Sequence, residues 1–364
     1  MKRKKIDSFF LILIISLVLL GFFIFSSAAL GQLTKTGAGF LMVVSKQFII
    51  LLTGLILMLV VAQIPYKHWR QYSIFLFILA VILSLLVLIP RLGFEAGGAR
   101  RWLNLGLLSF QPAEFLKFTM VIYLAAWLAT QKERVKKIST GLIPVLILMT
   151  ILGLILVTIQ KDTGTFLVAA TTASIMFFIG GGKIRHLLIL TLIGAVALSV
   201  MAYRRPYIQE RLITFINPNY DTKGASYQIN QSLIAIGSGQ ISGRGFGQSV
   251  QKFSFLPESI GDSIFAITSE EFGFVGSSSL IILWLIFALW GYKLALKIKD
   301  PFGRFMIIGF ISLIIVQTFI NIGAMLGLIP LTGVPLPFVS HGGTALLFSL
   351  LEAGIILNIS KHRA

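Results

Sequence analysis

The sequence predicts an all-α polytopic membrane protein with about ten transmembrane helices. Hydrophobic residues make up 56% of the 364-residue chain and charged residues only 12%, and the mean hydropathy is +0.92. Apolar runs long enough to cross a bilayer, which takes about 20 helical residues, recur from one end of the chain to the other. A soluble globular fold is therefore excluded, and no repeat of fixed period is visible. We expect one multi-pass domain, residues 1–364, in the cytoplasmic membrane.

Ten apolar segments are the predicted spans. They cover residues 9–30, 46–64, 72–90, 112–130, 141–159, 164–181, 186–203, 263–291, 304–329 and 341–359. The first follows the basic run Lys2-Arg3-Lys4-Lys5, as the core of a signal peptide would. It is too long for such a core and nine more spans follow, so we interpret it as a retained helix.

Basic residues in the short loops predict the orientation. If the N-terminus is cytoplasmic, the inner segments hold 18 of the 31 Lys and Arg residues and the short outer segments hold 7. The segment 204–262 is left out of this comparison, because long loops cross the membrane regardless of their charge. Both termini are therefore expected inside and the loop 204–262 outside. The net charge of +18 follows from this topology, and we expect no nucleic-acid partner.

The outer loop 204–262 is too long to be a simple connector. A loop of about 59 residues in a compact protein is usually functional or disordered. Its aromatic and aliphatic content favours order, and residues 227–236 have the pattern of a short amphipathic helix on the outer surface.

Acidic residues concentrate where this loop meets the eighth span. Four of only 13 acidic residues lie here, namely Glu258, Asp262, Glu270 and Glu271. Acids at a membrane boundary are costly to desolvate, which points to a function. Asp262 could equally cap the helix that follows, since Asp is a favoured N-cap residue. The helix N-terminus would lower the pKa of this carboxyl and burial would raise it, and the sequence leaves that balance open.

A second charged pair lies at the start of the fourth span. Glu114 and Lys117 are spaced i,i+3 and so face one side of the helix, which Pro112 begins. They are either an interior pair lining a polar cavity or a pair that reaches to the membrane surface.

Arginines flank the outer ends of several spans. Arg100 and Arg101 beside Trp102 would suit a phosphate or pyrophosphate, which Arg grips with two hydrogen bonds, although Trp102 is also ordinary at a membrane interface. For Arg204, Arg205 and Arg211, simple positioning next to the membrane is the favoured interpretation. Lys161 and Asp162 lie in a loop of a few residues and are interpreted as marking a turn, with a further role left open.

Prolines and glycines interrupt the chain between the last two spans. Residues 327–344 contain three prolines and four glycines. Irregular backbone at membrane depth survives only where protein or a water-filled cavity covers it, so we expect a cavity wall to which Ser340 and His341 contribute. His341 is not expected to bind a metal, because the other histidines fall on the inner side, and the absence of cysteine excludes thiolate sites.

These stretches, in this order, resemble the SEDS family (shape, elongation, division and sporulation), which includes FtsW, RodA and SpoVE. The resemblance covers residues 9–360, and the ending Leu357-Asn-Ile-Ser360 is more similar to FtsW-type members. The matching segments are Gly98-Ala-Arg-Arg-Trp102, Gln111-Pro-Ala-Glu114, Asp162-Thr-Gly-Thr165, Tyr227-Gln-Ile-Asn-Gln231, Gly237-Ser-Gly239, Gly243-Arg-Gly245, Leu256-Pro-Glu258, Asp262 to Gly276, Gly333-Val-Pro-Leu-Pro-Phe338 and Ser340 to Gly343.

The resemblance implies a peptidoglycan glycosyltransferase that polymerises lipid II outside the cytoplasmic membrane with a class B penicillin-binding protein. The family's essential aspartate falls on Asp262, and its Glu/Lys pair falls on Glu114 and Lys117. Two departures are Ile260-Gly261, where many relatives have His-Thr, and His341, where many have Tyr. The first removes a neighbour that could hydrogen-bond the aspartate.

This chemistry needs a carboxylate base and cations for the departing pyrophosphate. We expect Asp262 to be the base, near Glu258, and Arg101 to receive the pyrophosphate, with Arg205 or a divalent cation (Mg²⁺ or Mn²⁺) as a further candidate. Glu114 and Lys117 would shape the cavity where the lipid chains enter. A transporter that flips lipid II without chemistry fits ten spans and interior charges too, and a scaffold that recruits the penicillin-binding protein is the third alternative.

Overall fold

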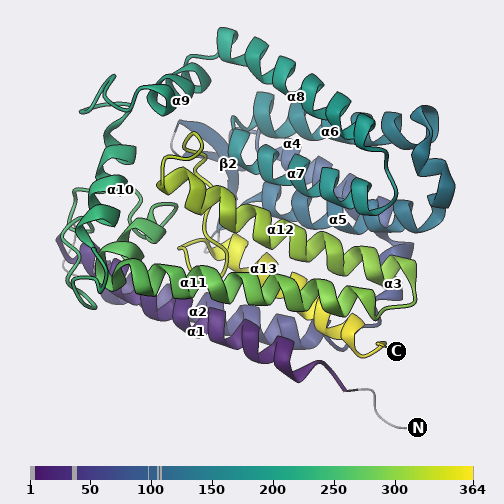
Figure 1. Ribbon diagram of the computed structural model, residues 1–364, viewed down its shortest axis with the longest axis horizontal. Coiled ribbons are helices and arrows are strands. Elements are labelled where there is room, and N and C mark those ends of the chain that lie inside the picture. Colours follow the sequence, from purple (N-terminus) through teal and green to yellow (C-terminus); the bar gives the residue numbers. More distant parts are fainter. Residues whose placement is uncertain (1–4, 35–38, 97, 105, 107–108, 364) are drawn as a thin grey trace.

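Helices run almost the whole length of the chain in the computed structural model (Figure 1). The structure describes residues 5–34, 39–96, 98–104, 106 and 109–363; the basic residues 2–4 and Gly97 lie outside these ranges. Eight helices among the described residues are long and apolar enough to cross a membrane. Two shorter apolar helices, Ser73–Leu86 and Thr163–Ile179, stand where the third and sixth spans were expected. The multi-pass helical fold is confirmed, and the count of ten spans stays a prediction.

The helices follow one another with short connections. Their bounds are α1 Ser8–Ala29, α2 Gly39–Val61, α3 Lys67–Gln71, α4 Ser73–Leu86, α5 Pro112–Gln131, α6 Ile143–Gly153, α7 Thr163–Ile179, α8 Ile184–Arg204, α9 Pro206–Ile216, α10 Tyr227–Ser238, α11 Ile264–Leu296, α12 Pro301–Met325 and α13 Gly343–Ser360. Short 3₁₀ turns cover Leu30–Thr34 and Lys132–Lys136, and π-helical turns flank α6 at Ile138–Leu142 and Leu154–Ile159.

A small antiparallel sheet accompanies the helices. Strands β1 (Gly93–Ala96), β2 (Ala99–Asn104) and β3 (Ser109–Phe110) pair in the order β1-β2-β3. The turn between β1 and β2 includes Gly98 at φ 73°, a conformation that glycine adopts without strain. Phe94 and Trp102 face each other across the two strands and their rings stack 6.4 Å apart. Alternation over so few residues is too short to stand out among long apolar runs.

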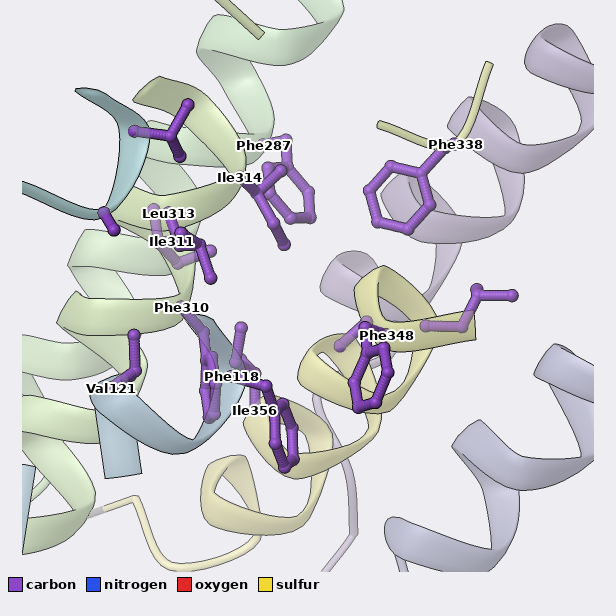
Figure 2. Packing of buried hydrophobic residues seen from close by; sticks show 14 of the residues in the cluster. Phe118, Val121, Phe287, Phe310, Ile311, Leu313, Ile314, Phe338, Phe348 and Ile356 are labelled. Atoms are coloured by element: carbon purple, nitrogen blue, oxygen red, sulfur yellow. The ribbon is translucent and has the colours of Figure 1, made fainter. Parts of the chain in front are cut away.

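The centre of the bundle is α12, which packs against α5, α7, α11 and α13. Figure 2 shows this core, where Phe118 of α5 lies between Phe310 of α12 and Phe348 of α13. The ring centroids of Phe118 are 5.3 Å and 5.5 Å from those two rings. A Cβ atom at Gly309 would lie 2.5 Å from Val121, so glycine lets α12 approach α5 closely. Close packing of this kind holds helices together in lipid.

The two chain ends lie at one end of the bundle, and α9 and α10 lie at the other (Figure 1). This is the arrangement that the predicted orientation requires, although which end faces the cytoplasm stays a prediction. The expected amphipathic helix at 227–236 is confirmed as α10, which packs against α11 and buries Ile229, Ser232 and Ala235. Helix α9 was not expected, although Pro206 stands at its first turn, where proline is favoured.

Helix α11 breaks at Gly273, where φ is 65° and ψ is −164°. The loop 240–245 docks against the break and takes over its backbone hydrogen bonds. The amides of Phe274 and Val275 donate to the carbonyls of Gln240 and Ile241, and those of Arg244 and Gly245 donate to Glu270 and Glu271. A Cβ atom at Gly273 would lie 2.3 Å from the amide nitrogen of Gly243, so only glycine fits.

Glu270 and Glu271 also hold this loop through their side chains. The ammonium of Lys252 lies 2.7 Å from Glu271 Oε1, and both side chains are buried. Ser27 at the end of α1 donates to the Glu271 carboxylate, while Glu270 accepts from the amide of Val250 at 3.0 Å. Buried carboxylates need such partners. The loop residues 240–252 and the helical residues Ile264–Phe272, which these contacts join, are called the cap below.

Candidate functional site

Asp262 lies between the cap and the bundle, two residues before α11 begins. The N-cap of α11 is Ser263, and no side chain caps the helix there. The capping interpretation of Asp262 is therefore wrong, because the helix starts one residue later than that role requires. Instead its carboxylate oxygen Oδ1 accepts a hydrogen bond from the side-chain amide of Gln228, 3.3 Å away on α10. The half-buried carboxylate thus makes no capping hydrogen bond to α11.

The backbone before α11 is fixed by three consecutive hydrogen bonds. The amide of His341 donates to the carbonyl of Ile260 at 2.7 Å, and the hydroxyl of Ser340 donates to that of Gly261 at 2.7 Å. The side-chain amide of Asn321, on α12, donates to the carbonyl of Asp262 itself at 2.7 Å. A carboxylate on such a backbone is held in place before a substrate arrives, which is what catalysis requires.

The surroundings of Asp262 raise its pKa from 3.8 to about 6. Burial is the largest cause, because it penalises the charged form, and the negative charge of Glu258 adds to it. The hydrogen bond from Gln228 and the positive charge of Arg211 act in the opposite direction. Burial and the charge of Glu258 thus outweigh the effects that lower the pKa. A carboxyl with this pKa is mostly ionised at neutral pH yet remains basic enough to accept a proton.

A polar cavity of about 380 Å³ opens beside Gln228. Its walls come from the sheet, the turn after α6, α9 and α10, and the residues that carry its chemistry are Arg101, Lys161, Tyr207, Glu210, Arg211 and Gln228. A Cβ atom at Gly333 would lie 3.7 Å from Asp262 Oδ2 and 3.7 Å from Arg211 Nη2, so these two side chains converge next to the cavity. Asp262 itself does not line the cavity. It is connected to the cavity through Arg211 and Gln228, and the cations Arg101 and Lys161 and the carboxylate of Glu210 also stand in the cavity wall.

The arginines of the cavity are fixed by backbone carbonyls. Arg101 on β2 donates to the carbonyls of Gln160 and Lys161, at 2.9 Å and 2.6 Å, and Arg211 on α9 donates to that of Thr332 at 3.3 Å. Asp162, beside Lys161, caps α7 by accepting from the amide of Thr165. The short turn after α6 therefore positions an arginine, in addition to marking a helix start.

Three other expected residues do not line the cavity. Arg205 precedes α9 with an exposed side chain and is not among the lining residues, because it is Arg211 that α9 turns toward the cavity. Trp102 alternates with Arg101 along β2 and so faces the other side of the sheet, against Phe94. The side chain of Glu258 is exposed and acts on Asp262 through its charge.

An apolar pocket of about 90 Å³ adjoins the polar cavity, with Thr214 and Leu331 lining both. Its other walls include Phe215, Ile229 and Leu326. The two together offer a charged region next to an apolar one.

The Glu114–Lys117 pair is confirmed as an ion pair, with Lys117 Nζ 2.9 Å from Glu114 Oε1. The side chains are only 6% and 2% exposed, which rules out a pair that reaches to the membrane surface. Neither residue lines the polar cavity or the apolar pocket. His341 and Ser340 likewise act as supports: the imidazole of His341 lies 3.1 Å from the Gln47 side chain, and burial together with Lys46 lowers its pKa.

The chain matches one protein family along almost its whole length. The family model of the cell cycle proteins FtsW, RodA and SpoVE matches residues 7–364. The chain belongs to this family. It is 37% identical to the stage V sporulation protein E of Bacillus subtilis over all of this chain and 99% of that protein. It is 34% identical to a probable peptidoglycan glycosyltransferase FtsW of Geobacter metallireducens, over 99% of this chain and 96% of the relative.

Solved structures of SEDS proteins have the same fold. A chain from a structure described as a peptidoglycan synthase complex that coordinates polymerization and crosslinking has a TM-score of 0.80 and 26% identity, with 98% of each chain covered. The rod shape determining protein RodA of Thermus thermophilus has a TM-score of 0.72 and 26% identity, covering 98% of this chain and 97% of RodA. This SEDS protein is therefore a multi-pass membrane protein.

Sequence reasoning did not select three residues whose side chains lie next to Asp262, namely Gln228, Arg211 and Asn321. Gln228 lies in the segment Tyr227-Gln-Ile-Asn-Gln231, which contributed to the family resemblance but did not indicate what Gln228 does. Arg211 was grouped with Arg204 and Arg205, of which only Arg205 was kept as a candidate, because the unrecognised α9 concealed which of the three turns inward. Asn321 is a polar residue inside an apolar span, and such residues are often functional.

The divalent cation considered above would have no cluster of three protein ligands among the described residues. Within the described ranges, no three His, Asp or Glu side chains come close enough together to hold a metal ion. Arg101, Lys161 and Arg211 supply positive charge at the cavity instead. We therefore assign no chemical step to a metal.

Proposed function

We propose that this SEDS protein is a peptidoglycan glycosyltransferase that polymerises lipid II at the outer face of the cytoplasmic membrane. The observation that carries the proposal is a preorganised carboxylate, Asp262, converging with Arg211 beside a cavity that Arg101 and Lys161 also line. The curated relative from Geobacter metallireducens is named a probable peptidoglycan glycosyltransferase, which supports the same activity here.

In the proposed reaction, Asp262 removes the proton from an acceptor sugar hydroxyl. The hydroxyl oxygen forms the new glycosidic bond at the anomeric carbon of the donor, and the bond from that carbon to the polyprenyl pyrophosphate breaks. The proton ends on the Asp262 carboxyl, and the leaving pyrophosphate carries the electron pair away. With a pKa of about 6, roughly nine-tenths of Asp262 is ionised at pH 7 and ready to act.

Arg101, Arg211 and Lys161 would stabilise the departing pyrophosphate. Both guanidinium groups are fixed by backbone carbonyls, so they need little reorganisation when negative charge develops. The apolar pocket lined by Phe215, Ile229 and Leu326 suits the beginning of a prenyl chain. This assignment replaces Arg205 with Arg211 in the expected set.

A penicillin-binding protein is the proposed partner. The structural neighbour described as a peptidoglycan synthase complex combines polymerization with crosslinking, and the similarity covers 98% of both chains. Activity should therefore be measured on the complex with its partner, in the presence of membrane lipids. We infer that the partner is of class B.

The decisive experiment compares wild type with Asp262→Asn, each purified in detergent with its penicillin-binding partner. Asn keeps the shape of the side chain and can still bond to Gln228, but it cannot take a proton. We expect glycan polymer from lipid II with wild type and a loss of at least about a hundredfold with the variant. Full activity of folded Asp262→Asn would exclude the base role. If wild type makes no polymer in detergent, where no second leaflet exists, a lipid II transporter is favoured instead.

A further inference from the structure

The Glu114–Lys117 ion pair lies inside the bundle with two further polar side chains. Lys117 Nζ donates to Gln317 Oε1 on α12 at 2.6 Å, and Glu352 on α13 is buried within electrostatic reach of both members of the pair. None of these four residues lines the polar cavity or the apolar pocket. A charged cluster of this kind is costly inside an apolar bundle, so its role has to be sought elsewhere than in substrate contact.

Gln317 connects this cluster to the irregular segment before α13. Its side-chain nitrogen Nε2 donates to the carbonyl of Pro335 at 2.9 Å, while its oxygen accepts from Lys117. Lys117 can only donate and the Pro335 carbonyl can only accept, so the orientation of the Gln317 amide is fixed. The ion pair thus determines which way Gln317 presents its donor.

Asn321 lies one turn further along the same face of α12. Its nitrogen Nδ2 donates to the carbonyl of Val334 at 2.8 Å and to the carbonyl of Asp262 at 2.7 Å. Two amide side chains spaced i,i+4 therefore hold two consecutive carbonyls, those of Val334 and Pro335. Gln317 contacts the charged cluster through Lys117, and Asn321 contacts the backbone of Asp262.

The segment that they hold needs such partners. Residues 326–342 form no regular helix or strand, and Pro335 and Pro337 lack an amide proton. Its carbonyls lie within the bundle, where an unpaired polar group is costly. The next residues of this segment, Ser340 and His341, bind the carbonyls of Gly261 and Ile260. A shift of the segment would therefore move the whole backbone that carries Asp262.

We propose that Lys117, Gln317 and Asn321 are positioning residues, which transmit the geometry of the Glu114–Lys117 pair through the segment 334–341 to Asp262. The inference rests on the proposed function, since it assumes that Asp262 is the base. In this way a buried ion pair on α5 would influence a reaction at the end of the bundle although it lines neither the polar cavity nor the apolar pocket. It also replaces the expectation that this pair shapes the entrance for lipid chains.

The test is Gln317→Met, which keeps the length of the side chain and removes both of its hydrogen bonds. The matched control is Thr318→Ala on the same helix, because the Thr318 hydroxyl bonds only to the carbonyl of Ile314 within α12. Hydrogen exchange is measured at the amides of Gly261, Ser263 and His341, and polymerase kinetics are measured on the complex with the partner.

We expect Gln317→Met to lower kcat by about 10- to 100-fold with KM within about twofold of wild type, because a misplaced catalytic group costs rate rather than binding. Amide exchange at Gly261, Ser263 and His341 should become at least about tenfold faster than in Thr318→Ala. Asn321→Ala should give the same pattern, and the double variant should lose less than the product of the two single losses.

Kinetics and exchange indistinguishable from Thr318→Ala would overturn the proposal, as would a loss confined to KM. If Gln317→Met does not fold, Asn321→Ala provides the same two measurements without touching the charged cluster. If wild type makes no polymer, the proposed function fails, and the exchange rates still decide whether these residues hold the backbone of Asp262.

Discussion

Removal of the Glu258 charge should make Asp262 more acidic. Glu258 is exposed and four residues before Asp262, and its negative charge is the second largest cause of the raised pKa after burial. In Glu258→Gln the side chain keeps its shape and loses this charge. The ionised form of Asp262 is then less disfavoured, so the pKa falls and the base stays active at lower pH.

The magnitude follows from the raised pKa. The difference between about 6 and the ordinary value of 3.8 corresponds to about 3 kcal/mol against ionisation of Asp262. Burial accounts for the larger part. Solvent screens the exposed Glu258 carboxylate, so its charge accounts for the smaller part.

The assay is the rate of lipid II polymerisation by the complex from about pH 5 to about pH 8. Wild type should lose kcat/KM on the acid side with a midpoint near pH 6, because the protonated base cannot accept a proton. In Glu258→Gln the midpoint should move to lower pH, by less than the full difference between about 6 and 3.8. Glu133→Gln, which removes an exposed carboxylate at the end of α5, is the charge control and should leave the midpoint unchanged. A midpoint that stays in place in Glu258→Gln, or moves equally in both variants, would refute this electrostatic account.

Two further variants test the cavity and the cap. Arg211→Gln should raise KM for lipid II, because Arg211 lines the cavity. It should also shift the acid midpoint of the rate to higher pH, because Arg211 favours the ionised form of Asp262. Kinetics measured across pH would contradict both expectations if only kcat fell. Lys252→Met leaves the Glu271 carboxylate buried without its cation, and should lower the free energy of unfolding in detergent by about 3 kcal/mol. An unfolding curve that matches wild type would show that this ion pair contributes nothing to the cap.

Much of the fold could be predicted because membrane spans have a strong sequence signal. Long apolar runs located the helices, and basic residues separated one end of the bundle from the other. Asp262 and the Glu114–Lys117 pair stood out because charge is rare and costly in such a chain. The small sheet and α9 could not be predicted, since their few residues lack a periodicity that competes with the spans.

The arrangement around Asp262 lay beyond sequence reasoning for a different reason. Whether Arg205 or Arg211 faces the cavity depends on the rotation of α9, which a single turn of helix changes. The roles of Asn321 and Gln317 depend on backbone carbonyls of an irregular segment, and every residue type offers the same carbonyl. Such partners can be identified only when the path of the backbone is known.

The break at Gly273 alters where the lipid-facing part of the chain begins. Helix α11 has 33 residues, which at 1.5 Å per residue would extend about 50 Å, well beyond a hydrocarbon layer of about 30 Å. The portion after the break is long enough to traverse that layer alone, so the buried portion before it, Ile264–Phe272, belongs with the cap. Asp262 is consequently attached to the cap and to α12, and not to the portion of α11 after the break. Tilting of the lower half of α11 in response to bilayer thickness would leave the carboxylate where α12 anchors it.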